Sequence, residues 1–318
     1  MDYILFLAGV AVTLIGADWL VDGASGLAKR FGVSEFAIGV VIVGLGTSMP
    51  ELTVSTMGAL RGSASIAIGN VTGSNLFNTL LILGVTALIS PIAYSAKERR
   101  KDMGFNIGAS LVLLVFALDA FIFHSAQGIL SRAEGIGMLL LFALYIFITF
   151  KNDEIEPSSS AEIGDAKAQG VLRLGLTVLA GIALLVVGGH LFVERGCNIA
   201  RQWHVSESVI AMTLMAGGTS LPELATCIVA ALKKQDALAL GNILGSNIAN
   251  ILLILGCCAT ITPLGVSPID LESIAVLPVV GILLWITAFI PKRLQLGRAE
   301  GALFVLIYAA YITYAILH

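Results

Sequence analysis

Two short sequences of this chain occur twice at a constant spacing. GTSMPEL at residues 46–52 returns as GTSLPEL at 218–224, and GNVTGSNLFNTLLILG at 69–84 returns as GNILGSNIANILLILG at 241–256. Both pairs are offset by 172 residues, and 23 of 46 positions are identical between 46–91 and 218–263 without a gap. Repeated use of Leu and Ala does not produce matched Pro, Glu and Asn residues. The chain therefore contains an internal repeat.

The composition places the repeat in a membrane. Of the 318 residues, 57% are hydrophobic and only 12% are charged, about half the charged fraction of a soluble domain. The mean hydropathy is +0.95. A net charge of −3 provides no basic surface for nucleic acid. A water-soluble enzyme and a DNA-binding protein are both excluded, and the sequence predicts an all-α polytopic membrane protein.

Ten apolar runs are long enough to cross a bilayer, which takes about 20 residues. Their approximate ranges are 3–21, 33–60, 64–89, 104–123, 131–150, 172–193, 205–232, 237–261, 271–290 and 300–317. Continuous apolar runs lack the alternation of a membrane β-barrel. Residues 1–150 and 172–318 then form two repeats of five helices, and the polar, Ser-rich residues 151–171 form a linker. Because five is odd, the second repeat enters from the opposite side, the inverted arrangement of many secondary transporters.

The basic residues predict the orientation. Of the 18 Lys and Arg residues, 14 lie in the loops between helices 1–2, 3–4, 5–6, 7–8 and 9–10. Loops rich in Lys and Arg face the cytoplasm. Both termini are therefore expected outside a cell membrane (plasma or inner), with the 151–171 linker in the cytoplasm.

Each copy of the shorter motif places a glutamate, Glu51 or Glu223, near the middle of an apolar run. A carboxylate at that depth costs about 2.5 kcal/mol or more, and it is normally functional. No basic residue lies deep in a span to neutralise it. The preceding Pro50 and Pro222 remove a backbone donor, so both helices are expected to break beside the acid. Free carbonyls, hydroxyls and carboxylates are hard oxygen ligands, suited to Na⁺ and Ca²⁺.

Other polar residues recur with the glutamates. Thr47 and Ser48 precede Glu51, and Thr219 and Ser220 precede Glu223 in the same way. In helices 3 and 8, an i, i+4 spacing puts Ser and Asn on one face, as Ser74 with Asn78 and Ser246 with Asn250. Such residues alone can hold helices together, but their repetition beside the Glu motif favours cation coordination.

Three further features have a structural explanation. The spacing of Gly69 with Gly73, and of Gly241 with Gly245, indicates close helix packing and not a phosphate loop. Asp18 is expected to face water at the membrane interface. His190 and Glu194 are expected to form an i, i+4 pair.

The doubled pattern G-T-S-x-P-E plus G-N-x-x-G-S-N-x-x-N resembles the alpha repeats of the calcium/cation antiporter superfamily, and most of all its prokaryotic sodium/calcium exchangers. The resemblance covers nearly the whole chain. It implies a secondary antiporter that exchanges Na⁺ for Ca²⁺ by alternating access. Ca²⁺ and Na⁺ would be its substrates, with no cofactor and no obligate protein partner.

Carried over by position, the resemblance implies a central Ca²⁺ site formed by Glu51 and Glu223 with the carbonyls of Thr47 and Thr219. Asn78 and Asn250 would complete that centre. Flanking Na⁺ sites would use two sets of ligands, one of Ser48, Ser246, Glu223 and the Ala216 carbonyl, and one of Ser220, Ser74, Glu51 and the Gly44 carbonyl.

The chain departs from the family at Asn250, where well-studied exchangers carry Asp. This removes an ionisable group from the centre and makes K⁺ co-transport less favoured, because K⁺-dependent relatives carry acids there. GNVTGSN and GNILGSN also lack the Glu of the proton-coupled branch. The alternatives are an antiporter driven by H⁺ or another cation, a channel and a membrane enzyme. The sequence lacks H-E-x-x-H and G-x-S-x-G motifs, and inverted repeats with broken helices suit alternating access better than a channel.

Overall fold

The computed structural model describes residues 1–95, 101–122, 128–151, 170–205, 217–288 and 295–317. Its first half contains α1 (Asp2–Phe31), α2 (Glu35–Ile38), η1 (Gly39–Gly44), α3 (Leu45–Thr47), α4 (Met49–Leu60), α5 (Ala64–Leu76), η2 (Phe77–Ile82), α6 (Leu83–Ile89), α7 (Met103–Ile122) and α8 (Arg132–Lys151). The second half contains α10 (Val171–Gln202), α12 (Leu221–Leu232), α13 (Asp236–Ile248), η5 (Ala249–Leu255), α14 (Gly256–Ile261), α15 (Pro268–Thr287) and α16 (Arg298–Leu317). Each of the ten predicted apolar runs overlaps one of these helices or a continuous series of them.

By length and apolar composition, six of the described helices can cross a membrane, or seven when the bent pair Glu35–Thr47 and Met49–Leu60 is one span. The described parts of the other three runs are α7, α12 and α16. The spans through α5–α6 and α13–α14 are the most buried, with 72% and 83% of an apolar stretch of 18 residues inside the protein. These two form the centre of the bundle. The large apolar side chains of the outer helices remain exposed, as at Leu140, Leu176 and Leu179, which fits contact with lipid.

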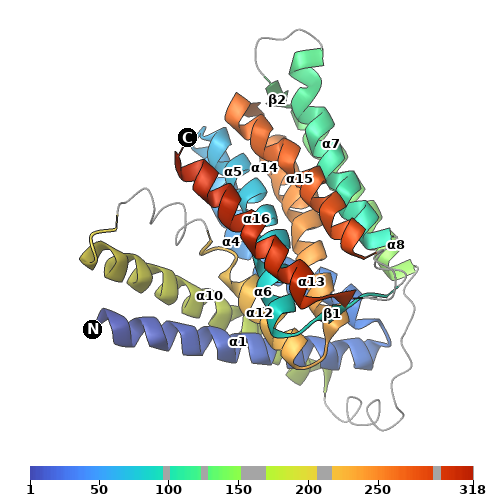
Figure 1. The fold of residues 1–318 in the computed structure, drawn as a ribbon. Helices are drawn as coiled ribbons and strands as arrows, with labels where there is room; N and C mark the ends of the chain where they lie inside the picture. The colour runs from blue at the N-terminus through green and yellow to red at the C-terminus, as the bar shows by residue number, and fades with distance from the viewer. Residues whose placement is uncertain (96–100, 123–127, 152–169, 206–216, 289–294, 318) are drawn as a thin grey trace.

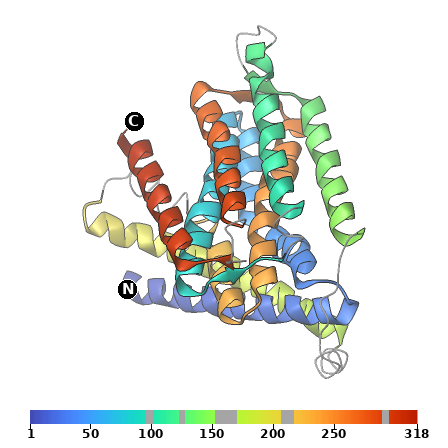
Figure 2. The ribbon, with the colours of Figure 1, turned by 45° about the vertical axis from the view of Figure 1, so that its right-hand side comes forward.

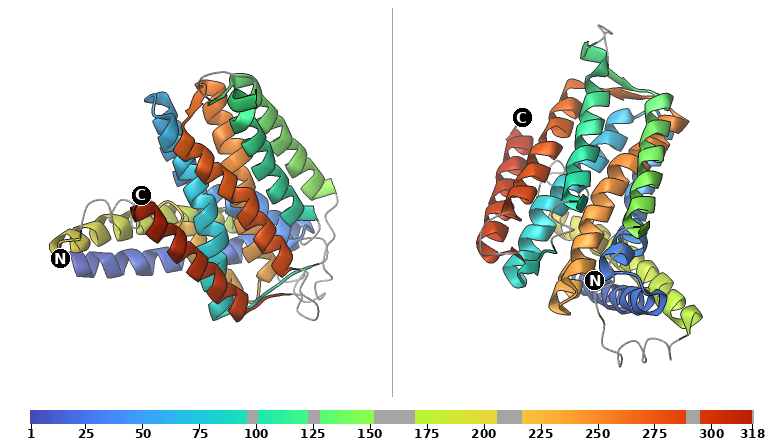
Figure 3. Two further views of the ribbon diagram at one scale, coloured as in Figure 1. Left: turned by 45° about the horizontal axis from the view of Figure 1, so that its top comes forward. Right: turned by 90° about the vertical axis from the view of Figure 1, so that its right-hand side faces the viewer.

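Helices α1 and α10 are about ten residues longer than the predicted runs 3–21 and 172–193. The two lie side by side and are steeply inclined to the other helices (Figure 1, with further views in Figures 2 and 3). A strongly tilted helix needs more residues to cross the same thickness. Glycines allow the two backbones to approach closely: a Cβ on Gly16 would lie 2.7 Å from Leu185 N, and one on Gly181 would lie 2.6 Å from Leu20 N.

The predicted break at Pro50 is present. The helix bends by 49° between α3 and α4, and Ser48 at the junction has non-helical dihedral angles (φ −83°, ψ 8°). On the second copy, α12 begins at Leu221 after a turn over residues 217–220. The preceding part of that span, with Ala216, lies outside the described residues.

Short π-helical segments interrupt both central spans. η2 contains Asn78 and η5 contains Asn250. A π-segment fits an extra residue into one turn, and such segments are frequent at functional sites. The sequence did not predict these segments, because LFNTLLILG has the composition of an uninterrupted apolar helix.

Two small antiparallel sheets tie loops together at the two ends of the bundle. β1 (Ile92–Ala93) pairs with β4 (Gln295–Leu296), and β2 (Gly128–Leu130) pairs with β3 (Leu264–Val266). β1 and β3 start at positions separated by the same 172 residues as the sequence repeat. The division into repeats 1–150 and 172–318 with a 151–171 linker remains a prediction, and residues 152–169 lie outside the described part of the chain.

Candidate cation site

The two broken spans place Glu51 in the first turn of α4 and Glu223 in the first turn of α12, and both side chains are completely buried. Pro50 and Pro222 occupy the positions just before them, where a helix tolerates proline because its N–H would have no partner there. The amino end of a helix favours negative charge. The local fold therefore holds an acid at each break.

The serines at the breaks connect the two copies of the motif. Ser48 and Ser220 occupy the N-cap positions of α4 and α12, but neither side chain makes a capping hydrogen bond. Ser48 Oγ donates instead to Glu223 Oε1 at 3.1 Å, and Ser220 Oγ donates to Glu51 Oε1 at 2.8 Å. Each acid is thus bound by the serine of the other repeat, which brings the two motifs into one site.

The central spans contribute a second pair of serines. Ser74 Oγ donates to Glu51 Oε1 at 3.3 Å, so Ser74, Ser220 and Glu51 lie together as the family resemblance implies. Ser246 Oγ, by contrast, donates to the Gly44 carbonyl at 3.2 Å. That contact places Gly44 beside Ser246, whereas the resemblance put it in the set with Ser220 and Ser74. The Gly44 carbonyl also accepts from Ser48 N at 3.1 Å, so it is not a free carbonyl at the break.

Two threonines and two asparagines complete the predicted set. Thr47 is buried and its Oγ1 donates to the Val43 carbonyl at 3.0 Å, while Thr219 is half-buried. Asn78 and Asn250 have no exposed surface. The structure therefore places the described predicted residues at the two helix breaks and on the two central spans that pack against them.

Several buried side-chain oxygens of this site lack a hydrogen-bond partner. At this site, five buried side-chain oxygens have no hydrogen-bond partner among the described residues: Glu51 Oε2, Glu223 Oε2, Asn78 Oδ1, Asn250 Oδ1 and Thr219 Oγ1. Buried polar atoms are nearly always paired, and no described basic nitrogen lies within 4.0 Å of either carboxylate. Carboxylate and amide oxygens are ligands for hard cations such as Ca²⁺. No described cluster has three or more His, Cys, Asp or Glu side chains, because the site has only two acids and is otherwise built from amides and hydroxyls.

Four asparagines in this region were not proposed from the sequence. Asn70 Nδ2 donates to the Glu51 carbonyl at 3.3 Å, and Asn242 Oδ1 lies 3.2 Å from Thr47 Oγ1. Asn75 and Asn247 bond the amides of Asn250 and Asn78. All four belong to the repeated G-N-x-x-G-S-N-x-x-N pattern, so their repetition was a usable signal.

Comparison with known proteins identifies the family. The profile of the family described as "Sodium/calcium exchanger protein" matches residues 1–151 and 174–317. The chain belongs to the sodium/calcium exchanger family. As a member of a transporter family it is a membrane antiporter and not an enzyme, which confirms the family and the function predicted from the repeated motifs.

Individual exchanger relatives match over almost their whole length. The chain is 32% identical to the sodium/calcium exchanger MaX1 of Methanosarcina acetivorans, covering 98% of this chain and 97% of that one. It is also 32% identical to the putative antiporter CaxA of Alkalimonas amylolytica, covering 97% and 96%. A solved structure of the sodium-calcium exchanger NCX_Mj, soaked with 10 mM Na⁺ and no Ca²⁺, superposes with a TM-score of 0.82 at 32% identity over 98% of both chains. The fold is therefore the ten-span, inverted-repeat fold of this exchanger family.

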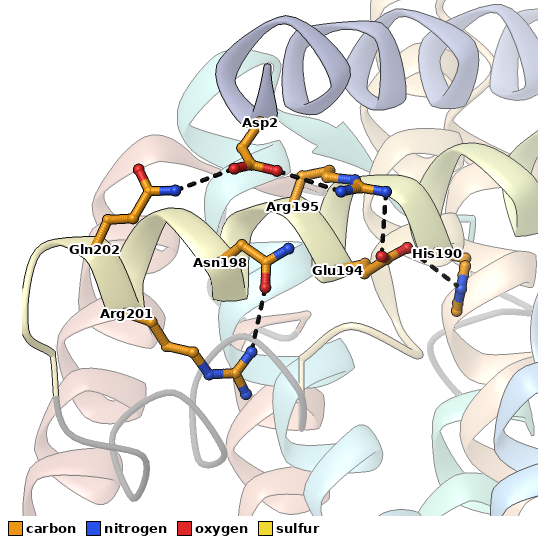
Figure 4. Close-up of polar contacts among 7 residues, drawn as sticks. All are labelled: Asp2, His190, Glu194, Arg195, Asn198, Arg201 and Gln202. Carbon is orange, nitrogen blue, oxygen red and sulfur yellow. Dashed lines mark hydrogen bonds and ion pairs between the residues drawn. The ribbon is translucent and has the colours of Figure 1, made fainter.

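A cavity of about 620 Å³ lies beside the two helix breaks of this exchanger and is lined by Pro50, Thr219 and Pro222 among others. Its wall also includes His190 and Glu194 on α10 and Thr53 on α4. His190 Nε2 lies 3.9 Å from Glu194 Oε2, which confirms the predicted pair. Figure 4 shows this part of α10, where the side chains of Arg195 and Gln202 also bond Asp2 of α1.

The equivalent positions of the other repeat form ion pairs. Lys233 lies at the carboxyl end of α12. Its Nζ is 2.7 Å from Asp18 Oδ1 and 2.6 Å from Asp22 Oδ1, both on α1. Asp18 is half exposed, as expected of an interfacial acid. Asp18 and Asp22 are the repeat counterparts of His190 and Glu194. Equivalent positions in the two repeats therefore line a cavity on one side and form ion pairs on the other.

Proposed function

We propose that this exchanger moves Ca²⁺ against Na⁺ through the site between the two helix breaks. The observation that carries the proposal is the pair of fully buried glutamates, each bound by a serine of the other repeat and each with a free carboxylate oxygen. With no described basic group beside them, the natural counter-charge is a bound cation. The relatives of this chain include a sodium/calcium exchanger, which supports the same ions.

Glu51 and Glu223 are proposed as the shared ligands of Ca²⁺, with Asn78 and Asn250 at the centre and the carbonyls of Thr47 and Thr219 on either side. The two carboxylates carry two negative charges, which balance one Ca²⁺ or two Na⁺. The serine hydroxyls that bond the carboxylates are proposed as ligands of the flanking Na⁺ ions, with Ser74 and Ser220 at Glu51, and Ser48 at Glu223. Ser246 and the carbonyls of Gly44 and Ala216 are the remaining proposed Na⁺ ligands.

The competing proposal is a H⁺/Ca²⁺ antiporter, and transport by purified protein in liposomes separates the two. We expect ⁴⁵Ca²⁺ uptake when Na⁺-loaded vesicles are diluted into Na⁺-free buffer, and no uptake when Na⁺ is equal on both sides. A Na⁺ ionophore should abolish the uptake, whereas a proton ionophore should not. Uptake that follows a pH gradient and ignores Na⁺ would support the alternative, and uptake without any counter-ion gradient would indicate a channel.

The two inverted repeats, residues 1–150 and 172–318, are proposed to expose the site alternately to the two sides of a cell membrane. A cavity at one repeat and ion pairs at its counterpart support this proposal, because alternating access by inverted repeats needs the two equivalent regions to differ. With both termini outside, the cavity beside α10 faces the exterior. The lipid bilayer is the only macroscopic partner this proposal needs.

Cysteine labelling tests the orientation and the side of the cavity. In a variant with its four cysteines replaced by alanine, a membrane-impermeant maleimide should label Arg61→Cys and the cavity-lining Thr53→Cys in intact cells. Gly170→Cys, next to the linker, should react only after the membrane is opened. Labelling of Gly170→Cys in intact cells would contradict the proposed orientation. Labelling of Arg61→Cys without Thr53→Cys would contradict an outward-facing cavity.

A further inference from the structure

We propose that Asn75 and Asn247 are positioning residues, which fix the side-chain amides of Asn250 and Asn78 so that their oxygens face the transported cation. This inference rests on the proposed function. It concerns two residues whose described hydrogen bonds involve neither glutamate, and it assigns them a role in cation affinity.

The first observation is a pair of hydrogen bonds that cross between the repeats. Asn250 Nδ2 donates to Asn75 Oδ1 at 3.0 Å, and Asn78 Nδ2 donates to Asn247 Oδ1 at 3.1 Å. The two bonds are equivalent under the 172-residue offset, which relates 75 to 247 and 78 to 250. All four side chains are at most 4% exposed, so water does not replace these bonds.

The second observation is that the orienting amides are themselves held. Asn75 Nδ2 donates to the Asn247 carbonyl at 3.1 Å, and Asn247 Nδ2 donates to Thr79 Oγ1 at 2.8 Å. Each of the four amides therefore has its nitrogen bonded within the chain. The two amide oxygens left without a described partner are those of Asn78 and Asn250.

These bonds select one of the two ways in which each amide can point. An Asn amide has a donor end and an acceptor end of nearly the same shape. Turning Asn250 over would place its oxygen against Asn75 Oδ1 and its N–H groups toward the cation, which loses a buried hydrogen bond and repels the ion. Residues that orient metal ligands in this way commonly contribute about 10- to 100-fold to metal affinity.

The same geometry gives a reason for asparagine at position 250. An ionised carboxylate there could not donate to Asn75 Oδ1, and two buried acceptors would face each other. Asn75 could relieve that contact only by turning over, which would give up its bond to the Asn247 carbonyl. The amides at 75 and 250 are therefore matched to each other, as are those at 78 and 247.

Equilibrium ⁴⁵Ca²⁺ binding to purified protein in a double-mutant cycle tests the role. Asn75→Ala is expected to raise the Kd for Ca²⁺ about tenfold in the otherwise unchanged chain. In an Asn250→Ala background the same change should alter the Kd less than about twofold, because its effect passes through Asn250. Asn106→Ala, which removes an equally buried asparagine on α7, is the matched control and should leave the Kd unchanged.

A second double-mutant cycle, Asn247→Ala with Asn78→Ala, tests the equivalent hydrogen bond. It takes the place of the Asn75–Asn250 cycle if an Asn75 variant fails to fold. An unchanged Kd in Asn75→Ala, or losses that add in both cycles, would overturn the positioning role while leaving Ca²⁺ binding itself intact. Absence of Ca²⁺ binding and Na⁺-driven uptake in the unaltered chain would instead overturn the proposed function. The two failures are thus distinct.

Discussion

Glu51→Gln and Glu223→Gln are each expected to abolish Na⁺-driven Ca²⁺ uptake in liposomes. Each change keeps the shape of the side chain but removes one of the two negative charges that balance Ca²⁺. An amide also replaces a free carboxylate oxygen with either an oxygen of lower charge or an N–H₂ group directed at the cation. We expect uptake to fall by about 100-fold or more, because Ca²⁺ binds best where several oxygens supply enough negative charge.

The same substitutions should preserve the fold. Gln accepts a hydrogen bond from Ser220 or Ser48 through its amide oxygen, so the contacts between the repeats can persist. Glu272→Gln changes an exposed acid on α15 and provides the matched control. Near-normal uptake by either site variant, at equal amounts of folded protein in the vesicles, would remove that glutamate from the proposed site.

Much of the fold was readable from the sequence because its determinants are local. Long apolar runs specify spans, and a proline before Glu51 specifies a break. No Lys or Arg lies deep in a span to neutralise the glutamates, and this local feature of the sequence indicated a bound cation as their counter-charge. The ends of α1 and α10 were not predictable on this basis. Residues beyond 21 and 193 no longer form apolar runs, and they are helical because two inclined helices pack along their whole length.

Contacts between the repeats were harder to predict. The repeat shows that Ser74 and Ser246 are equivalent, but it does not say which copy of the other motif each one contacts. Ser246 lies against Gly44, a contact that depends on how α13 packs on η1. The π-segments at Asn78 and Asn250 have the same origin, since an extra residue in a turn is set by tertiary packing and not by apolar periodicity.

The asparagines show a different limit of sequence reasoning. Asn75 and Asn247 were as strictly repeated as Asn78 and Asn250, yet the sequence alone did not separate ligands from the residues that orient them. That distinction depends on which amide end is already bonded, and therefore on the hydrogen bonds of the folded chain.

The glycines of the repeated motif bring the central span against the broken span. A Cβ on Gly245 would lie 2.6 Å from Val40 Cα, and one on Gly241 would lie 2.5 Å from the Phe36 carbonyl oxygen. Both contacts are with backbone atoms, which cannot turn aside as a flexible side chain can. This confirms the predicted close packing for Gly241 and Gly245. For Gly69 and Gly73, no described atom lies within 4 Å of such a Cβ, and the equivalent segment, 208–212, is outside the described residues.

Gly245→Val is accordingly expected to lower Na⁺-driven Ca²⁺ uptake at least as strongly as any substitution outside the ligands. The added side chain must push α13 away from η1, which would separate Ser246 from Gly44 and Asn242 from Thr47. Overpacking of this kind raises the free energy of the packed arrangement by about 1–3 kcal/mol. That cost changes the equilibrium constant for forming the arrangement by about 5- to 150-fold. Gly245→Ala should give a smaller loss in the same direction.

Gly137→Ala on α8 is the control for these glycine variants, since no described atom of another helix lies within 4 Å of its added Cβ. Its uptake and thermal stability should match those of the unaltered chain. The measurement is ⁴⁵Ca²⁺ uptake at equal amounts of folded protein, together with the midpoint of thermal unfolding. Full uptake by Gly245→Val would show that the site does not depend on the close approach of α13 to η1. A loss of uptake with an unchanged midpoint would place the effect in the geometry of the site itself, because the rest of the fold would then have accommodated the larger side chain.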